Sequence, residues 1–220
     1  MTITAARHPR FVVVGCGRSG TGWISTVLDR SGLPTGHETV YNPSSLRSGI
    51  LPDWPPHLVG EASWLATPFV HMLPAATTIV HQVRHPVAVV RSFVRIRFFE
   101  EQSAYLDFVN AHDPDICRGS VVQRAVNYWL RWNALAELAT TEREGIRHRL
   151  EDVSVGELQK LVDRCGVVAP SLQTAFETVS TTTNSRGDTG LDHQISVQDL
   201  LELPNGDELR EVSHRYGYQL

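Results

Sequence analysis

The chain has 220 residues, of which 41% are hydrophobic and 20% are charged, and its formal net charge is −4. This composition supplies one hydrophobic core and excludes a disordered chain, and the length predicts a single domain over residues 1–220. The acidic balance excludes a generic nucleic-acid binder, which needs a basic surface. Among the 20 basic residues Lys160 is the only lysine, so anion binding would rely on arginine.

The cysteines and the apolar segments indicate the compartment. Cys16, Cys117 and Cys165 are odd in number and widely spaced, which predicts reduced thiols. No stretch is apolar for the roughly 18 residues of a membrane span, and residues 1–10 lack a signal-peptide core. We therefore expect a cytoplasmic protein without a membrane span.

The first elements are a strand, a turn and a helix. Phe11–Gly15 is a continuous run rich in valine, typical of a strand buried on both faces of a parallel sheet. A glycine turn follows, and from Thr21 the apolar residues recur at helical spacing until Gly32 and Pro34 end the helix. This order is typical of the start of an α/β domain.

The rest of the chain continues the alternation of strands and helices. The predicted elements are, in order, a long loop region at 34–68 with a short strand at 58–60, a strand at 77–83, a helix from Pro86 to residue 99 or 100, a helix at 121–141, a strand at 145–150, a helix at 155–164, a flexible loop at 181–190, and short helices at 196–203 and 207–215. This alternation predicts an α/β fold, a three-layer sandwich with a central parallel sheet.

The first candidate motif is the turn between the first strand and the first helix, Gly15–Trp23. Backbone N–H groups in a glycine turn before a helix N-terminus form an anion cradle, which indicates a phosphate or sulfate site. The turn lacks the Gly-Lys-[Ser/Thr] of a Walker A loop and the later acidic residue of a dinucleotide fingerprint. A turn that serves only to reverse the chain remains the alternative.

The second candidate motif follows the strand at 77–83. Arg84 stands at the carboxyl end of that strand, where α/β folds bind ligands, and Ser92 follows two helical turns later. Both side chains could hold one phosphate. A surface ion pair of Arg84 is the alternative.

Together the two stretches resemble the sulfotransferase family that uses 3′-phosphoadenosine 5′-phosphosulfate (PAPS) as donor. Residues 18–23 (Arg-Ser-Gly-Thr-Gly-Trp) are similar to the 5′-phosphosulfate loop of that family, and Arg84-x-Pro86 with Ser92 is similar to its 3′-phosphate motif. Residues 128–133, the later Glu151-Asp152 and the terminal Arg-Tyr-Gly-Tyr at 215–218 add to the resemblance. It implies a P-loop-NTPase-like sulfotransferase fold.

The resemblance also implies a set of donor-binding residues. The backbone amides and hydroxyls around the 5′-phosphosulfate would come from Gly17, Arg18, Ser19, Gly20, Thr21 and Gly22. Trp23 would stack on adenine, with a core aromatic as the alternative. Arg84 and Ser92 would bind the 3′-phosphate, and Arg186 stands where the family has a late basic loop. The sequence departs from the family at Arg18, which replaces a catalytic lysine, and at Leu150, which replaces a tyrosine.

The acceptor side needs a general base to remove the hydroxyl proton. The resemblance favours Glu38 over its neighbour His37, with Glu61 in reserve. An electrostatic role at the leaving oxygen falls to Arg18. The remaining histidines show no metal-ligand spacing, so no metal is expected.

These features predict a sulfotransferase whose acceptor carries a hydroxyl on a small molecule, glycan or lipid; a phenol or peptide is also open. Residues 43–56 and 98–117 would line the acceptor site. The alternatives are a P-loop-like kinase of a nucleotide or small molecule and a non-catalytic nucleotide-binding module. The oligomeric state is not encoded in any of these patterns.

Overall fold

The computed structural model describes residues 8–180 and 195–220, so the predicted loop at 181–190 and Arg186 lie outside the described residues. The strands are β1 (Phe11–Val14), β2 (Thr35–His37), β3 (Gly60–Ala62), β4 (Thr78–Val83) and β5 (Ile146–Arg149). The α-helices are α1 (Thr21–Arg30), α2 (Pro86–Arg95), α3 (Ala104–His112), α4 (Val121–Glu142), α5 (Val155–Arg164), α6 (Leu172–Thr178), α7 (Val197–Leu201) and α8 (Gly206–Arg215). Two 3₁₀ helices are η1 (Trp64–Met72) and η2 (Pro114–Cys117).

The five strands form one sheet in the order β2-β3-β1-β4-β5, and every neighbouring pair is parallel. In the register, Phe11 of the central strand β1 lies opposite Gly60 of β3 and Thr78 of β4. The predicted fold class, α/β with a central parallel sheet, is confirmed. In a parallel sheet all carboxyl ends meet at one edge, which collects the turns after β1, β2 and β4.

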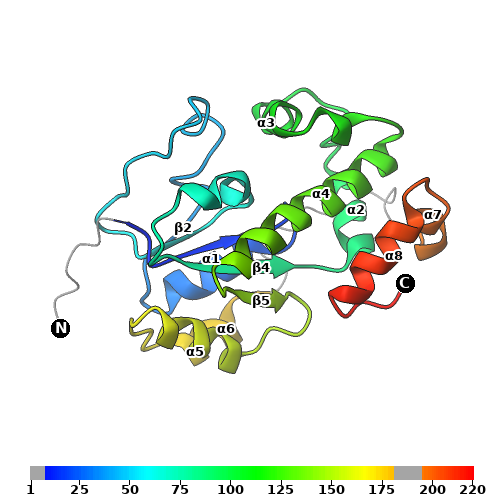
Figure 1. The fold of residues 1–220 in the computed structure, drawn as a ribbon. Helices are drawn as coiled ribbons and strands as arrows, with labels where there is room; N and C mark the ends of the chain where they lie inside the picture. Colours follow the sequence, from blue (N-terminus) through cyan, green and yellow to red (C-terminus); the bar gives the residue numbers. More distant parts are fainter. Residues whose placement is uncertain (1–7, 181–194) are drawn as a thin grey trace.

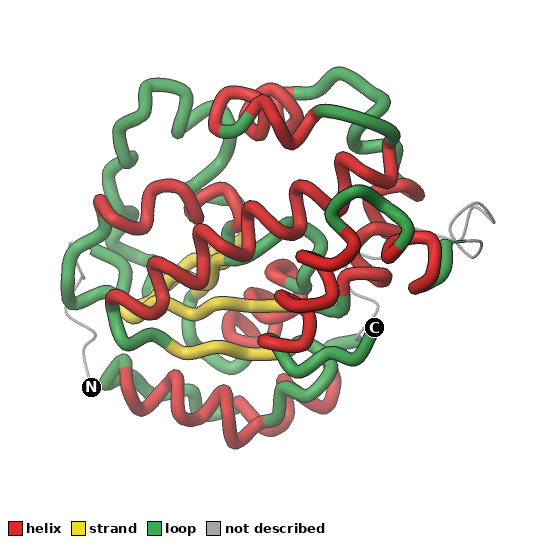
Figure 2. The backbone as a smooth tube through the Cα atoms, turned by 45° about the vertical axis from the view of Figure 1, so that its right-hand side comes forward, coloured by secondary structure: helices red, strands yellow, loops and turns green. Residues whose placement is uncertain are grey.

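Helices cover both faces of the sheet and complete three layers (Figure 1). Along β1 the side chains alternate: Phe11 and Val13 pack in the core beneath α1, α5 and α6, whereas Val12 and Val14 pack in the core beneath η1, α2 and α4. Figure 2 shows the sheet between these helical layers. A central strand buried on both faces explains why residues 11–14 are all apolar.

The structure differs from the sequence prediction within residues 34–68. The predicted strand at 58–60 is displaced to 60–62, because Leu58 still belongs to a turn in which its N–H bonds to the carbonyl of Pro55. Strand β2 was not predicted, because its three residues include a glycine and its backbone bonds come from its neighbour β3. The helical segments η1, α3, η2 and α6 were also missed.

The helix α2 ends at Arg95, earlier than the predicted residue 99 or 100. Arg97 has a left-handed backbone (φ 54°), the N–H of Phe98 bonds to the carbonyl of Phe93, and the N–H of Arg97 bonds to the carbonyl of Val94. These bonds form a Schellman motif, in which the ring of Phe98 packs on that of Phe93 at 5.0 Å. The motif turns the chain towards α3.

The C-terminal segment is anchored to the sheet. The hydroxyl of Tyr216 donates to Glu137 of α4 at 3.1 Å, and that of Tyr218 donates to Glu151 after β5 at 2.8 Å.

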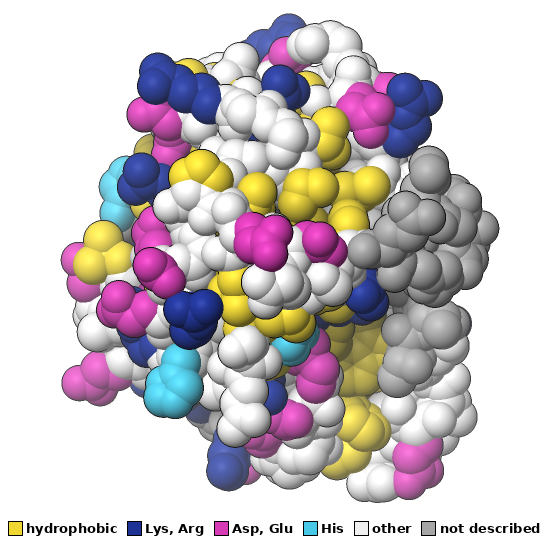
Figure 3. Space-filling model, turned by 90° about the vertical axis from the view of Figure 1, so that its right-hand side faces the viewer, with side chains coloured by type: hydrophobic (Ala, Val, Ile, Leu, Met, Phe, Trp, Pro, Cys, Tyr) yellow, Lys and Arg dark blue, Asp and Glu magenta, His cyan; other side chains and the backbone are white. Residues whose placement is uncertain are grey.

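Within the described residues, no helix combines the length and the apolar character needed to cross a bilayer. On the face that carries α8, the basic side chains are interspersed with acidic ones (Figure 3).

Candidate active site

The glycine turn after β1 leads into the N-terminus of α1 and adopts a shape that depends on glycine. Gly20 is the N-cap of α1 with a φ of 94°, and a Cβ atom there would lie 2.7 Å from Cδ1 of Leu150. No side chain in the described part of the chain caps this helix. The first backbone N–H groups of α1 are therefore available to an anion.

Two buried contacts hold the turn in place. The N–H of Gly17 donates to the hydroxyl of Tyr128 on α4 at 3.1 Å, and the hydroxyl of Ser19 donates to the carbonyl of Cys16. Ser19 is fully buried. Its hydroxyl therefore shapes the turn from within, and its part in donor binding stays a prediction.

Arg18 connects the turn to the second motif. Its Nε donates to Oγ of Ser92 at 2.8 Å, and its carbonyl accepts a hydrogen bond from Nη1 of Arg84 at 3.1 Å. Its backbone is left-handed, with a φ of 68°. Arg18 is thus in direct contact with Ser92 and Arg84, which follow it in the sequence by 74 and 66 positions.

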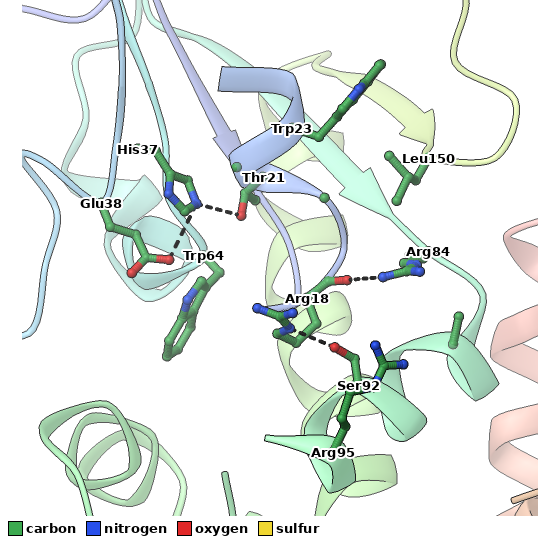
Figure 4. Close-up of a pocket in the computed structure, with 13 residues that line it drawn as sticks. Arg18, Thr21, Trp23, His37, Glu38, Trp64, Arg84, Ser92, Arg95 and Leu150 are labelled. Carbon is green, nitrogen blue, oxygen red and sulfur yellow. Dashed lines mark hydrogen bonds and ion pairs between the residues drawn. The ribbon is translucent and has the colours of Figure 1, made fainter. Parts of the chain in front are cut away.

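These residues line a cavity that we call the arginine cavity (Figure 4). Its lining consists of Arg18, Gly20, Thr21, Gly22, Trp23, His37, Glu38, Trp64, Arg84, Ala88, Ser92, Arg95 and Leu150. Three guanidinium groups and a helix N-terminus meet here, in a chain whose net charge is negative. This set fits a ligand with more than one anionic group.

Sequence reasoning missed Arg95. It lies three residues after Ser92 on α2, so both side chains stand on one face of the helix. That spacing was the available signal. Burial lowers the pKa of Arg84, Glu151 acts in the opposite direction, and the neighbouring charge of Arg95 lowers it further.

Trp23 belongs to the cavity wall and to the core. It is 5% exposed and packs edge-to-face on Phe176 of α6, with ring centroids 5.6 Å apart. Its indole Nε1 is buried and has no hydrogen-bond partner within the described residues. The two alternatives for this side chain are therefore compatible, since a ring can pack on α6 and still present a surface to a ligand.

His37 and Glu38 follow β2 at the same edge of the sheet. The Nε2 atom of His37 lies 3.3 Å from the hydroxyl of Thr21 and 3.6 Å from Oε1 of Glu38. Burial lowers the pKa of His37, which favours the neutral ring at neutral pH. Glu38 has a left-handed backbone (φ 51°), and burial together with the nearby carboxylate of Glu38 raises the pKa of Tyr105 on α3.

Glu61, the reserve candidate for the base, lies beneath the loop that follows Glu38. Its side chain is fully buried, and its Oε1 accepts hydrogen bonds from the backbone N–H groups of Thr39, Val40 and Tyr41 at 2.7, 2.9 and 3.2 Å. Burial raises its pKa to about 7 against these hydrogen bonds. This geometry gives Glu61 a scaffolding role for the loop, and it is absent from the described lining of the arginine cavity.

A second cavity of about 550 Å³ adjoins the first, and we call it the aromatic cavity. Its lining consists of Gly17, Arg18, His37, Glu38, Trp64, Phe93, Ile96, Arg97, Phe98, Glu101, Gln102, Ser103 and Tyr105. Of the two segments predicted for the acceptor, 98–117 contributes part of this wall, whereas 43–56 contributes no residue to the described lining. Arg18, His37, Glu38 and Trp64 line both cavities.

The described residues contain no group of three or more His, Cys, Asp or Glu side chains that could hold a metal ion.

No protein-family profile matches the chain, and no curated protein matches its sequence. Solved structures do match its fold. A sulfotransferase domain from the curacin biosynthetic pathway superposes with a TM-score of 0.58 at 16% identity, over 98% of this chain and 100% of that one. A sulfotransferase from Alicyclobacillus acidocaldarius superposes with a TM-score of 0.49 at 13% identity, over 98% of each chain. The predicted resemblance is thus confirmed for the fold over the whole chain.

Proposed function

We propose that the protein is a sulfotransferase, with residues 1–220 as one domain, that moves a sulfuryl group from PAPS to an acceptor hydroxyl. The observation that carries this proposal is the junction of the arginine cavity and the aromatic cavity at Arg18, His37, Glu38 and Trp64. An anionic donor and a less polar acceptor need adjoining compartments of different chemistry, so that their reacting atoms meet at the boundary.

The arginine cavity would hold the donor. PAPS, when bound, supplies an activated sulfuryl group on its 5′-phosphate and carries a 3′-phosphate. The backbone N–H groups of Gly20, Thr21 and Gly22, which line the cavity, would bind the 5′ end at the N-terminus of α1. Arg84, Ser92 and the newly recognised Arg95 would bind the 3′-phosphate, since all three line the side of the cavity formed by β4 and α2.

Arg18 and Glu38 would act on the transfer itself. The Arg18 guanidinium borders both cavities, and its positive charge would stabilise the negative charge that develops on the oxygen leaving with the phosphate. Arginine does not donate a proton at ordinary pH, so its role is electrostatic. Glu38 stands at the same boundary and would accept the proton of the acceptor hydroxyl, with His37 as the alternative base.

The two alternatives make different demands on the site. A P-loop-like kinase needs a lysine in the phosphate cradle, and Lys160 lies on α5, outside the described lining of the arginine cavity. A non-catalytic nucleotide-binding module would use Arg84 and Ser92 but would have no need of Glu38.

Titration calorimetry with adenosine 3′,5′-bisphosphate and with AMP tests the donor assignment, because the ligands differ only in the 3′-phosphate. A hydrogen bond to a charged group contributes about 1.5–3 kcal/mol, so two or three such bonds should make the bisphosphate bind at least about 100-fold more tightly. Magnesium should change neither affinity.

Variants locate this preference in the arginine cavity. Ser92→Ala and Arg84→Ala should reduce it, and the matched control Arg164→Ala, an exposed arginine on α5, should leave it unchanged. Equal affinities for the two ligands, or tighter magnesium-dependent binding of ATP, would refute the sulfotransferase proposal and favour the kinase.

A further inference from the structure

The aromatic cavity is organised around Trp64, the first residue of η1. Its ring centroid lies 6.4 Å from that of Phe98, 6.0 Å from that of Tyr105 and 5.8 Å from that of Tyr128. Its backbone is also fixed, because Nε1 of Trp132 on α4 donates to the carbonyl of Trp64 at 2.9 Å. The floor of the cavity is therefore a rigid aromatic surface.

The walls are held in place before any acceptor binds. The Schellman motif at the end of α2 sets Phe98 on Phe93, and both rings line the cavity. On the other side, Ser103 caps α3 by accepting the N–H of Leu106 at 3.1 Å, which fixes the first turn that carries Tyr105. A preformed wall of rings favours a flat ligand that can pack on it face-on or edge-on.

The polar side chains at the rim of the cavity bind one another. Arg97 pairs with Glu101 at 3.2 Å, Gln102 donates to Asp107, and Ser103 serves as the cap of α3. Because these side chains already have partners, a sugar or a charged peptide would gain fewer new polar contacts from them than from unpaired groups. The rim therefore gives a polar acceptor little advantage.

The inner end of the cavity is polar. Glu38, His37 and Arg18 stand there, and Tyr105 lines the same cavity near the Glu38 carboxylate. A ligand that enters between the rings would therefore place one polar group beside the carboxylate and leave the rest of its body among aromatic side chains.

We infer that the acceptor is a neutral aromatic ring that carries a hydroxyl; this inference rests on the proposed function. In the transfer, the hydroxyl oxygen of the acceptor forms a bond to sulfur, and the bond between sulfur and the donor's phosphate oxygen breaks. The hydroxyl proton passes to Glu38 and then to water, and adenosine 3′,5′-bisphosphate leaves. A phenolic hydroxyl, whose pKa is about 10, suits a carboxylate base better than an aliphatic hydroxyl does.

The test measures transfer of the sulfuryl group from radiolabelled PAPS, by the full chain, to three acceptors that differ in aromaticity and polarity. These are 2-naphthol, its saturated counterpart 2-decalol, and methyl glucoside. We expect kcat/KM for 2-naphthol to exceed that for 2-decalol by about tenfold or more, because contacts between aromatic rings add to burial, and that for the glucoside to be lower still. Calorimetry of 2-naphthol and 2-decalol in the presence of adenosine 3′,5′-bisphosphate should give the same order of affinity without turnover.

Variants of the wall locate the binding. Tyr105→Leu should raise the KM for 2-naphthol about three- to tenfold, whereas Tyr105→Phe, which keeps the ring, should raise it less. Phe98→Leu should raise KM similarly. Its matched control is Phe99→Leu, since Phe99 belongs to the same aromatic cluster but not to the described cavity lining. Because Tyr105 is 38% exposed on α3, its variants should fold even if Phe98→Leu does not.

Failure of this inference is distinguishable from failure of the proposed function. If the protein prefers the bisphosphate over AMP but binds or sulfates 2-decalol or the glucoside as well as 2-naphthol, the acceptor inference is refuted and the sulfotransferase stands. The same conclusion follows if the bisphosphate binds and none of the three acceptors is sulfated. If the bisphosphate shows no preference over AMP, the proposed function itself fails.

Discussion

Glu61 offers a test of how the loop that bears Glu38 is held in place. Its carboxyl is fully buried on β3, with three backbone N–H groups at Oε1 and no partner at Oε2 within the described residues. On the neighbouring strand Gly36 lies opposite, where a Cβ would come within 2.1 Å of Oε2. Burial of the unpartnered oxygen outweighs the three amide bonds, so the pKa of Glu61 rises from 4.5 to about 7.

The sign and size of the effect on stability follow from this pKa. Because the folded protein binds the Glu61 proton more tightly than the unfolded chain, the contribution of this proton to stability is present below pH 4.5 and is lost as the pH rises through about 7. One pKa unit corresponds to about 1.4 kcal/mol, so the loss across this range is about 3 kcal/mol.

The assay is urea unfolding, followed by tryptophan fluorescence, of the wild type and of Glu61→Gln at several pH values between 4.5 and 8. The free energy of unfolding of the wild type, minus that of the variant, should fall by about 3 kcal/mol as the pH rises. His81 and His148 are buried with lowered pKa values and act in the opposite direction, because their contribution is lost as the pH falls below 6.5. They are present in both proteins, so the subtraction removes them.

A difference that stays constant from pH 4.5 to 8 would refute the reasoning, because it would mean that Glu61 does not change its protonation within this range. A difference that grows with pH would show that the amide hydrogen bonds outweigh burial and that the carboxylate is the preferred form. In the first case the pKa of Glu61 would equal its ordinary value, and in the second case it would lie below that value.

Three further predictions concern the site and its turn. Glu38→Gln should lower kcat by about 10²- to 10⁴-fold without changing the affinity for adenosine 3′,5′-bisphosphate. A loss of threefold or less in kcat in steady-state assays would show that His37 or Glu61, and not Glu38, is the general base. Arg18→Ala should depress kcat more than bisphosphate binding, with partial rescue by Arg18→Lys; equal losses in both quantities would reduce Arg18 to a binding residue. Gly20→Ala should lower the free energy of unfolding by about 1–3 kcal/mol more than Gly49→Ala, because both positions have positive φ but only Gly20 has a neighbour, Leu150, in the way of a Cβ.

The sequence by itself determined the parts of this protein that are encoded in neighbouring residues. A run of apolar residues with three valines is typical of a strand buried on both faces, and the glycine turn after it leads directly into α1. Arg84 before Pro86 marked the end of β4 and the start of α2. In each case the backbone period or a single special residue carries the information, so no distant contact was needed.

Only the tertiary structure decided which distant side chains meet at the site. Trp64, Arg95 and Tyr105 lie on three different helical segments, and none has a local pattern that marks it as part of a cavity. Glu61 and Glu38 are both loop-flanking carboxylates in the sequence, yet one is buried under the amides of residues 39–41 and the other faces the cavities. Such differences depend on burial and on contacts between segments that are remote in the chain, and these exist only once the sheet has brought the strand ends to one edge.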